Sequence, residues 1–265
     1  MITSRANQQI KNIIKLQKSS ERRSQNLIVI EGLREIERAL CSGWKIRTLY
    51  VCEALAEKKM NLLEKKINTD CSVEYVSKEV FECIAYREGS DGFLALCNPI
   101  LLQLEEVKLR TNPILLILEG IEKPGNLGAV MRTADAAGID AVIVCDPQTD
   151  LYNPNIIRAS LGCVFALQVI ATTSEKAIGW LYKNHIPIFC TSLEASRDYL
   201  TTDFTSSCAI VLGTESTGLS DLWIKNANQN ICIEMLGIAD SLNVSVTAAI
   251  VVFEAIRQRK RAIFL

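Results

Sequence analysis

The chain has 265 residues, of which 49% are hydrophobic and 22% charged, so it is long enough for two domains that each bury a core. Its formal net charge of -1 at pH 7 neither indicates nor excludes a polyanionic partner. The longest apolar run stops at Glu254, far short of the roughly 20 residues that span a bilayer, and the polar N-terminus has no signal-peptide core, so we expect no membrane association.

The first half of the chain predicts alternating helices and strands. Apolar residues at helical spacing predict a helix near 10–14, and the run at 27–32 predicts a buried strand closed by a glycine. The further elements expected here are helices over 33–40, 55–67 and 77–85 and strands over 46–52, 72–76 and 91–97. Prolines then interrupt the pattern, and we place a linker at 98–112 between domains at 1–97 and 113–265.

The first 25 residues carry an excess of positive charge, because six basic side chains stand against the single acid Glu21. Such an excess fits a surface that faces phosphate groups. It fits a solvated helix face equally well, and the charges alone do not separate the two interpretations. The basic residues are Arg5, Lys11, Lys15, Lys18, Arg22 and Arg23.

The second half predicts a parallel sheet. The near-continuous aliphatic run at 114–120 is typical of a strand covered on both faces. Helices and strands then alternate to the end of the chain, which predicts an α/β fold. The expected strands lie near 141–145, 167–170, 186–190, 208–213 and 229–233, and the expected helices lie within 126–138, 153–162, 174–184, 222–227 and 244–262.

The ten cysteines are never closer than eleven positions apart. The short Cys-x-x-Cys spacings of zinc sites are therefore missing, and we expect no metal. Most of the thiols lie in or beside apolar runs, where a reduced cysteine packs as a small hydrophobe. This usage favours a structural role for the cysteines and a reducing cytoplasm as the location.

Four loops that follow predicted strands are candidates for chemistry, because open α/β sheets bind ligands at the carboxyl ends of their strands. They lie at 119–138, 191–196, 213–220 and 233–245. The first is rich in glycine but contains neither GxGxxG nor GxxxxGK[ST], which weakens a dinucleotide or triphosphate interpretation. It carries Asn126 and Arg132, whose guanidinium suits an RNA phosphate, although helical arginines more often form surface ion pairs.

The other two strong loops concentrate polar residues. The loop at 213–220 holds Glu215 between glycines that would let a ligand lie against bare backbone. The loop at 233–245 leads into an apolar helix, and one N-cap would explain only one of its polar residues. Serine and threonine inside a helix cost propensity relative to alanine, so their hydroxyls should bond neighbouring loops. These residues are Ser241, Asn243, Ser245 and Thr247.

Three of these stretches resemble, in order and spacing, the signature motifs of the SpoU/TrmH family of RNA ribose 2'-O-methyltransferases in the SPOUT superfamily. They are "NLGAVMRTADAAG", "VLGTESTGLS" and "IEMLGIADSLNVSVTAAIVVFE". Residues 1–97 resemble, more loosely, the family's N-terminal RNA-binding domain with a ribosomal-protein-like fold. The resemblance implies methyl transfer from S-adenosylmethionine to a ribose 2'-hydroxyl, a trefoil knot within about 190–245, and a cytoplasmic homodimer.

The resemblance also assigns roles residue by residue. Catalytic positions fall on Asn126, Arg132, Glu215, Ser241 and Asn243. Cofactor contacts fall on Thr191, Leu212, Gly213, Ile233 and Leu242. We expect RNA contacts at Arg5, Lys11, Arg22, Arg23 and Arg132. The sequence departs from the family at Lys123, since an acidic residue is common before the proline of the first motif.

The transfer itself needs alignment more than acid–base power, because the sulfonium is already activated. A guanidinium with a pKa above about 12 accepts a proton poorly. We therefore expect Arg132 to hold the substrate phosphate and to stabilise the developing alkoxide while the proton leaves through phosphate or water.

Three other functions stay open at this point. The separate N-terminal domain favours ribosomal RNA as the substrate, but a transfer RNA 2'-O-methyltransferase has the same motifs. A non-catalytic RNA-binding assembly factor would keep the fold, although every motif position is filled here. A dinucleotide-dependent oxidoreductase lacks its glycine fingerprint in this sequence.

Overall fold

The computed structural model describes residues 1–56, 59–193 and 197–262 and forms two compact units. Unit 1 contains Met1–Ile100 and Asp150–Ala166, and unit 2 contains Leu101–Thr149 and Leu167–Leu265. The linker predicted at 98–112 includes the first boundary between the units. Residues 150–166 belong to unit 1, although the segments on both sides of them belong to unit 2. The predicted domain boundaries did not include this insertion.

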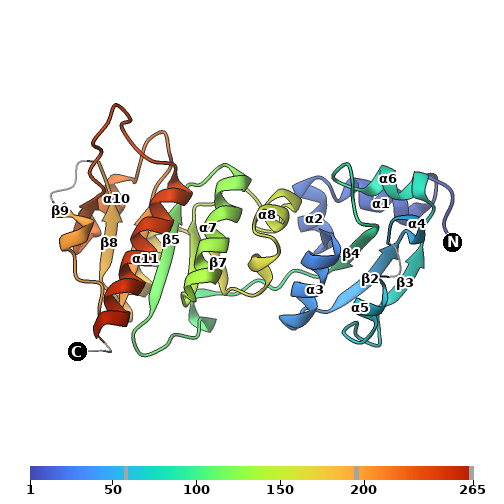
Figure 1. The fold of residues 1–265 in the computed structure, drawn as a ribbon, viewed down its shortest axis with the longest axis horizontal. Coiled ribbons are helices and arrows are strands. Elements are labelled where there is room, and N and C mark those ends of the chain that lie inside the picture. Colours follow the sequence, from blue (N-terminus) through green and yellow to red (C-terminus); the bar gives the residue numbers. More distant parts are fainter. Residues whose placement is uncertain (57–58, 194–196, 263–265) are drawn as a thin grey trace. The chain divides into compact units, whose positions relative to one another are not determined.

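Unit 1 is built on a four-stranded mixed sheet with the order β1-β4-β2-β3 (Figure 1). Strand β4 runs antiparallel to both β1 and β2, and β3 runs parallel to β2. The strands are β1 (Ile28–Glu31), β2 (Ile46–Val51), β3 (Ser72–Tyr75) and β4 (Phe93–Cys97). The helices are α1 (Gln8–Lys15), α2 (Ser19–Gln25), α3 (Leu33–Cys41), α4 (Glu53–Ala56), α5 (Asn61–Glu64), α6 (Lys78–Ile84) and α8 (Pro154–Ala159), with a 3-10 turn at Cys163–Phe165.

The predicted strands of this half are confirmed, but one predicted helix needs correction and one helix was missed. The helix expected over 55–67 is absent as one piece: α4 and α5 are single turns, residues 59–60 form a turn between them, and residues 57–58 lie outside the described chain. Each piece buries one side chain, Ala56 or Leu63, which supports no longer helix. Helix α2 was not predicted because its only buried residue is the charged Arg22.

Unit 2 is built on a seven-stranded sheet with the order β7-β6-β5-β10-β8-β11-β9. Every neighbouring pair is parallel, which confirms the predicted α/β fold with a parallel sheet. Strand β9 was not predicted, because two residues are too short for a hydrophobic pattern. The strands are β5 (Ile114–Glu119), β6 (Ala141–Cys145), β7 (Val169–Thr172), β8 (Ile188–Thr191), β9 (Arg197–Asp198), β10 (Cys208–Leu212) and β11 (Gln229–Cys232).

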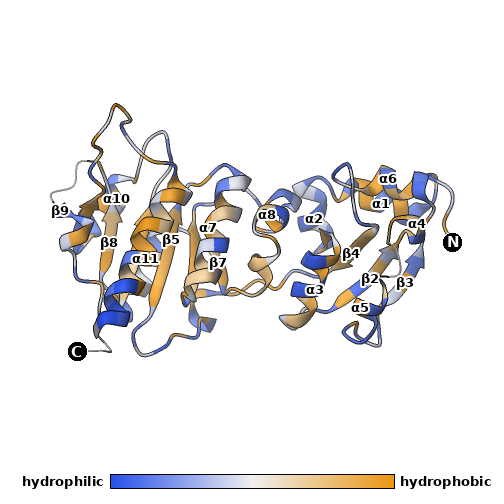
Figure 2. Ribbon diagram, in the orientation of Figure 1, coloured by the Kyte–Doolittle hydropathy of each residue, from blue (hydrophilic) through white to orange (hydrophobic). Residues whose placement is uncertain are grey.

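Helices cover both faces of this sheet. Alternate residues of β5, such as Leu115 and Ile117, pack in one core with α9 (Ser174–Lys183) and α10 (Asp221–Asn226). The intervening residues therefore face the opposite side. There α7 (Pro124–Ala137) and α11 (Val244–Ala262) lie side by side (Figure 1). Burial on both faces explains the continuous apolar runs, which Figure 2 shows as hydrophobic strands.

The strand order places β10, late in the chain, between β5 and β8. The carboxyl ends of β8, β10 and β11 consequently meet at one edge of the sheet. The trefoil knot is a property of how the chain threads through itself, which strand order alone does not define, and the knot stays an implication of the family resemblance.

Two further features of the described chain concern its helices and its thiols. Among its helices, none combines the length and the apolar character needed to cross a membrane. All ten cysteines lie in the described chain as thiols outside any disulfide, and six of them are buried. Burial raises the pKa of the Cys190 thiol to about 12, which keeps it protonated at neutral pH and fits the structural role predicted for these residues.

Candidate active site

A cavity of about 550 Å³ lies at the carboxyl edge of the sheet in unit 2. Its walls come from the segments that follow β8, β10 and β11 and from the first two turns of α11. All five residues predicted to contact the cofactor line it, together with Glu215 and Ser241. Of the loop at 191–196, residues 191–193 line the cavity and 194–196 lie outside the described residues. The five predicted cofactor contacts that line the cavity are Thr191, Leu212, Gly213, Ile233 and Leu242.

The loop at 213–220 closes on itself through its backbone. Thr214 and Gly218 exchange N–H to carbonyl hydrogen bonds of 3.1 Å in both directions. A Cβ added to Gly213 would lie 2.2 Å from the carbonyl carbon of Gly218, so no other residue fits at 213. The sequence suggested that Gly213 leaves room for a ligand, but its first requirement is to let the two ends of this loop touch.

Glu215, carried by that loop, is the centre of a polar cluster from three distant segments. Its carboxylate accepts a 2.9 Å hydrogen bond from Asn126 Nδ2 and a second from Asn243 Nδ2. It also forms an ion pair with Lys123 Nζ. Asn243 Nδ2 also lies 3.2 Å from Asn126 Oδ1. The structure therefore brings together three of the five residues assigned to catalysis, and it adds Lys123, which the sequence had marked only as a departure from the family.

The electrostatics of this cluster favour an ionised carboxylate. The hydrogen bond from Lys123, and after it the one from Asn126, hold the pKa of Glu215 below its usual value. The same pairing raises the pKa of Lys123. Both groups are thus charged at neutral pH, and Glu215 acts as an acceptor that gathers amide and ammonium donors and not as a proton donor.

Asn243 has a second role at the start of α11. Its side-chain oxygen accepts the backbone N–H of Ser245 at 3.0 Å and the Ser245 hydroxyl at 2.6 Å. Its carbonyl accepts the N–H groups of Val246 and Thr247, so Asn243 is the N-cap of this helix. The Ser245 hydroxyl was expected to bond a neighbouring loop, but it bonds Asn243 within its own loop, and Thr247 lines the cavity.

Glu119, at the carboxyl end of β5, anchors the far end of the loop at 213–220. It accepts the Ser220 N–H at 2.8 Å and the Ser220 hydroxyl at 2.6 Å. It also accepts the hydroxyl of the buried Ser174 at 3.3 Å, and Ser174 in turn accepts the Trp223 indole N–H at 3.0 Å. Sequence reasoning missed Glu119, although a carboxylate that ends a buried aliphatic strand was an available signal.

Two predicted catalytic residues have fewer contacts than the cluster. Ser241 lines the cavity with an exposed side chain. Arg132 is exposed in the third turn of α7, is not among the cavity-lining residues, and makes no hydrogen bond or ion pair with the part of the chain described. Its guanidinium is therefore available to a substrate, and its catalytic role stays a prediction.

The basic N-terminal segment divides into exposed and buried cations. Arg5, Lys11 and Arg23 are exposed, as a phosphate-binding surface requires. Arg22 is only 3% exposed. Its Nε pairs with Asp150 at 2.7 Å, and its Nη1 donates to the carbonyls of Leu16 and Gln17, each at 2.8 Å. The burial of Arg22 and the use of its Nε and Nη1 donors inside unit 1 argue against the expected contact with RNA.

Comparison with known families assigns both halves of the chain. The model of the SpoU rRNA methylase family matches residues 113–253, which is more than half of the sequence. The chain belongs to the SpoU rRNA methylase family. A second family model, the MRM3-like substrate binding domain, matches residues 7–95.

Curated relatives of this SpoU family member are similar over nearly their whole length. The "23S rRNA (guanosine(2553)-2'-O)-methyltransferase RlmP" of Bacillus subtilis is 29% identical over 95% of this chain and 97% of its own. The "23S rRNA (guanosine-2'-O-)-methyltransferase RlmB" of Haemophilus ducreyi is 34% identical over 87% of this chain and 97% of its own.

Solved structures agree with the family assignment. A crystal structure described as an RNA 2'-O ribose methyltransferase is 38% identical, covers 98% of this chain and 99% of its own, and superposes with a TM-score of 0.85. An rRNA methyltransferase from Sinorhizobium meliloti with bound AdoMet is 29% identical, covers 97% of both chains, and superposes with a TM-score of 0.87.

Proposed function

We propose that the protein methylates a ribose 2'-hydroxyl of ribosomal RNA with S-adenosylmethionine as the methyl donor. The observation that carries this function is the cavity at the carboxyl edge of the unit 2 sheet, with the polar cluster of Glu215, Asn126 and Asn243 from three motif segments beside it. Relatives similar over their whole length are named as 23S rRNA 2'-O-methyltransferases, which favours ribosomal RNA over transfer RNA.

The cavity fits S-adenosylmethionine by size and by chemistry. Its volume of about 550 Å³ lies in the range of small-molecule pockets, roughly 300 to 1,000 Å³. Apolar side chains such as Leu212, Ile231 and Val251 offer a surface for the adenine, and loop backbone and hydroxyl groups offer hydrogen bonds to the polar parts. No group of His, Cys, Asp or Glu in the described chain could hold a metal ion, and methyl transfer from a sulfonium requires none.

The residues of the site divide the work of the reaction. When bound, S-adenosylmethionine supplies an activated methyl group. Glu215 holds Asn126 and Asn243 in place, which fixes the three segments around the reacting atoms. The free guanidinium of Arg132 grips a substrate phosphate and stabilises the charge that develops on the ribose oxygen, and the proton leaves through phosphate or water.

Methyl transfer to isolated RNA tests the proposal. Purified protein is incubated with S-adenosylmethionine labelled in its methyl group and, in separate reactions, with ribosomal RNA and transfer RNA lacking modification. We expect label only in ribosomal RNA, at a ribose that resists alkaline cleavage. Label in transfer RNA would replace the substrate, and the absence of label from both, with RNA still bound, would favour a non-catalytic assembly factor.

RNA binding by unit 1 is part of the same proposal. The exposed cations Arg5, Lys11 and Arg23 offer phosphate contacts, and residues 7–95 match a substrate-binding family. We also propose that the enzyme works in a reducing cytoplasm, where its thiols stay reduced.

We further propose a homodimer formed through unit 2. Val246 and Phe253, seven residues apart on α11, are 45% and 46% exposed, and Leu236 and Ile238 before the helix are more exposed still. Large apolar side chains on one helix face favour burial against a second copy. Light scattering during gel filtration tests this: we expect twice the chain mass for the native protein and a single chain mass for Phe253→Glu.

A further inference from the structure

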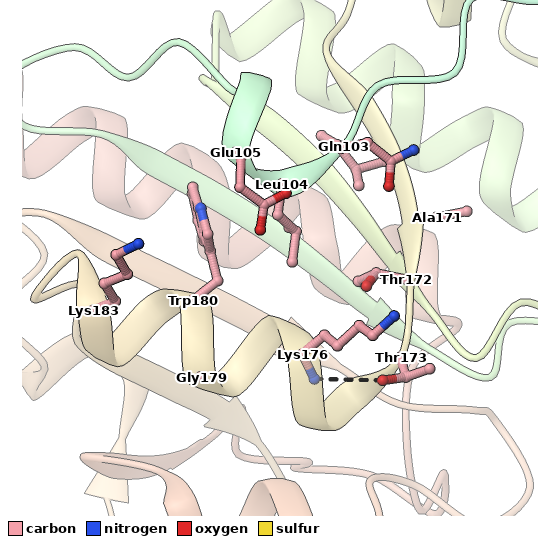
Figure 3. A pocket seen from close by; sticks show the side chains of 11 residues that line it. Gln103, Leu104, Glu105, Ala171, Thr172, Thr173, Lys176, Gly179, Trp180 and Lys183 are labelled. Carbon is pink, nitrogen blue, oxygen red and sulfur yellow. Dashed lines mark hydrogen bonds between the residues drawn. The ribbon is translucent and has the colours of Figure 1, made fainter.

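A second groove of about 450 Å³ lies in unit 2, apart from the residues that line the cofactor cavity. It runs between α9 and a 3-10 turn at Leu104–Glu106, in the segment that follows the end of unit 1 (Figure 3). From α9, Lys176, Trp180 and Lys183 project toward this turn, and Glu105 projects toward them.

The chemistry of the groove suits a nucleotide. Trp180 packs against the apolar core yet is only half-buried, so part of its indole faces the groove. Lys176 and Lys183 are exposed on either side of it, and neither forms an ion pair with the described residues. An aromatic surface between two cations binds a base by stacking and its phosphates by charge. Gln103 and Glu105 add hydrogen-bonding groups that a base edge can use.

The glycine at position 179, in the wall of this groove, supports the presence of a ligand. It occupies the interior of α9, where glycine costs helix stability relative to alanine. Packing does not require it, because a Cβ at this position would find nothing within 4 Å. The backbone is also an ordinary helical one, without the positive φ that favours glycine. A side chain at 179 would enter the groove, so the missing side chain keeps the groove open.

We propose that this groove binds an unpaired nucleotide of the RNA substrate, with its base against Trp180 and its phosphates at Lys176 and Lys183. The inference rests on the proposed function, because it assigns a place to the same RNA outside the methylation site. It gives unit 2 a contact with the RNA strand that does not depend on the basic N-terminal segment.

Tryptophan fluorescence reads out this binding directly. Of the three tryptophans, Trp44 and Trp223 are buried, so a stacked base can quench only Trp180. A short single-stranded RNA of mixed sequence should quench the emission of the native protein, and Trp180→Phe should remove the quenching while anisotropy of labelled RNA shows nearly native affinity. Trp180→Ala should weaken the affinity about tenfold. Quenching by free mononucleotides but not by the strand would overturn the assignment to RNA.

Gly179→Leu separates binding from folding. The substitution should raise the melting temperature, because leucine favours a helix and meets open space. It should also fill the groove and raise the KM for RNA about tenfold, with kcat and the affinity for S-adenosylmethionine unchanged. Gly179→Ala is the matched control, which should gain stability with a smaller loss of RNA affinity. A native KM for Gly179→Leu would overturn the proposal.

The charges give an independent measurement. Lys176→Ala combined with Lys183→Ala should lower the salt dependence of single-strand binding, reducing the slope of log K against log salt by about 1.4 for two lost phosphate contacts. An unchanged slope would exclude both lysines as phosphate ligands. If the native protein transfers no methyl group yet RNA quenches Trp180, the proposed function fails and the groove assignment stands; if it methylates RNA while all these variants behave as native, only the groove assignment fails.

Discussion

Polar side chains converge around Glu215 at a cavity in unit 2, whereas the basic segment of unit 1 buries one of its cations, Arg22, in the interior. At Glu215, donors from segments about a hundred residues apart converge at the rim of a cavity. At Arg22, a cation in the most basic stretch of the sequence turns inward and bonds two carbonyls and Asp150. Position after a strand therefore predicted which residues line a cavity, whereas density of charge did not predict which cations are exposed.

Arg22→Ala should produce the largest effect that follows from this comparison. Removing a buried cation leaves Asp150 and two carbonyls without their donors, so we expect a loss of about 3 kcal/mol in unfolding free energy, measured by urea denaturation. The exposed neighbour Arg23→Ala is the matched control and should leave stability unchanged while weakening RNA binding. Equal stability for the two variants would mean that the contrast between buried and exposed cations is wrong.

Arg132→Ala tests the role of the exposed cation in unit 2. We expect methyl transfer to fall by a factor of about 100 or more, because one donor to the developing charge is lost. Affinity for S-adenosylmethionine should stay native, since Arg132 does not line the cavity. Single-turnover kinetics and calorimetry measure the two quantities. Near-native turnover would remove Arg132 from the mechanism.

Asn243 has two structural roles, because it caps α11 and also contacts Glu215. Asn243→Ala should cost about 1 kcal/mol of stability and weaken cofactor binding. Asn243→Asp keeps the cap but reverses the contact, since a carboxylate still caps the helix but faces the ionised Glu215 without a donor. We expect a lower thermal stability from this repulsion and a reduced cofactor affinity for the Asp variant; native affinity would show that the contact with Glu215 is unimportant.

The smallest expected effect is the pH dependence of the cluster. Because the folded-state pKa of Glu215 is lowered, its contribution is present above the unfolded-state pKa and is lost as the pH falls through the lower folded value. Lys123→Met should raise the folded-state pKa of Glu215 toward its ordinary value, so that the contribution is smaller and its loss is complete at a higher pH. Carboxyl carbon NMR of labelled glutamate follows this titration. An unchanged pKa in the variant would mean that Lys123 does not stabilise the carboxylate.

Much of the fold could be read from local patterns. Strands that are buried on both faces have continuous aliphatic sequences, as at 114–120, so they can be predicted from the sequence. The loops that follow them could then be located as well. Elements held by polar or very short contacts left no such pattern, as helix α2 and strand β9 show. The membership of 150–166 in unit 1 depends on long-range packing of α8, which no periodicity reports.

The site was predictable to a similar degree. The five residues that the family motifs assign to the cofactor all line the cavity, whereas Glu119 and Lys123 matter through partners about a hundred residues away. Burial of a charge was the least predictable property. Nothing in the sequence around Arg22 distinguishes it from the exposed Arg23 beside it.

Calorimetric titration of the full chain with S-adenosylmethionine shows whether the loops after β8, β10 and β11 form the pocket for the methyl donor. We predict one binding site per chain, without added metal, that is weakened by Asn243→Asp and unaffected by Arg132→Ala. A folded protein that binds neither S-adenosylmethionine nor its demethylated product, with or without RNA, would exclude these loops as the pocket.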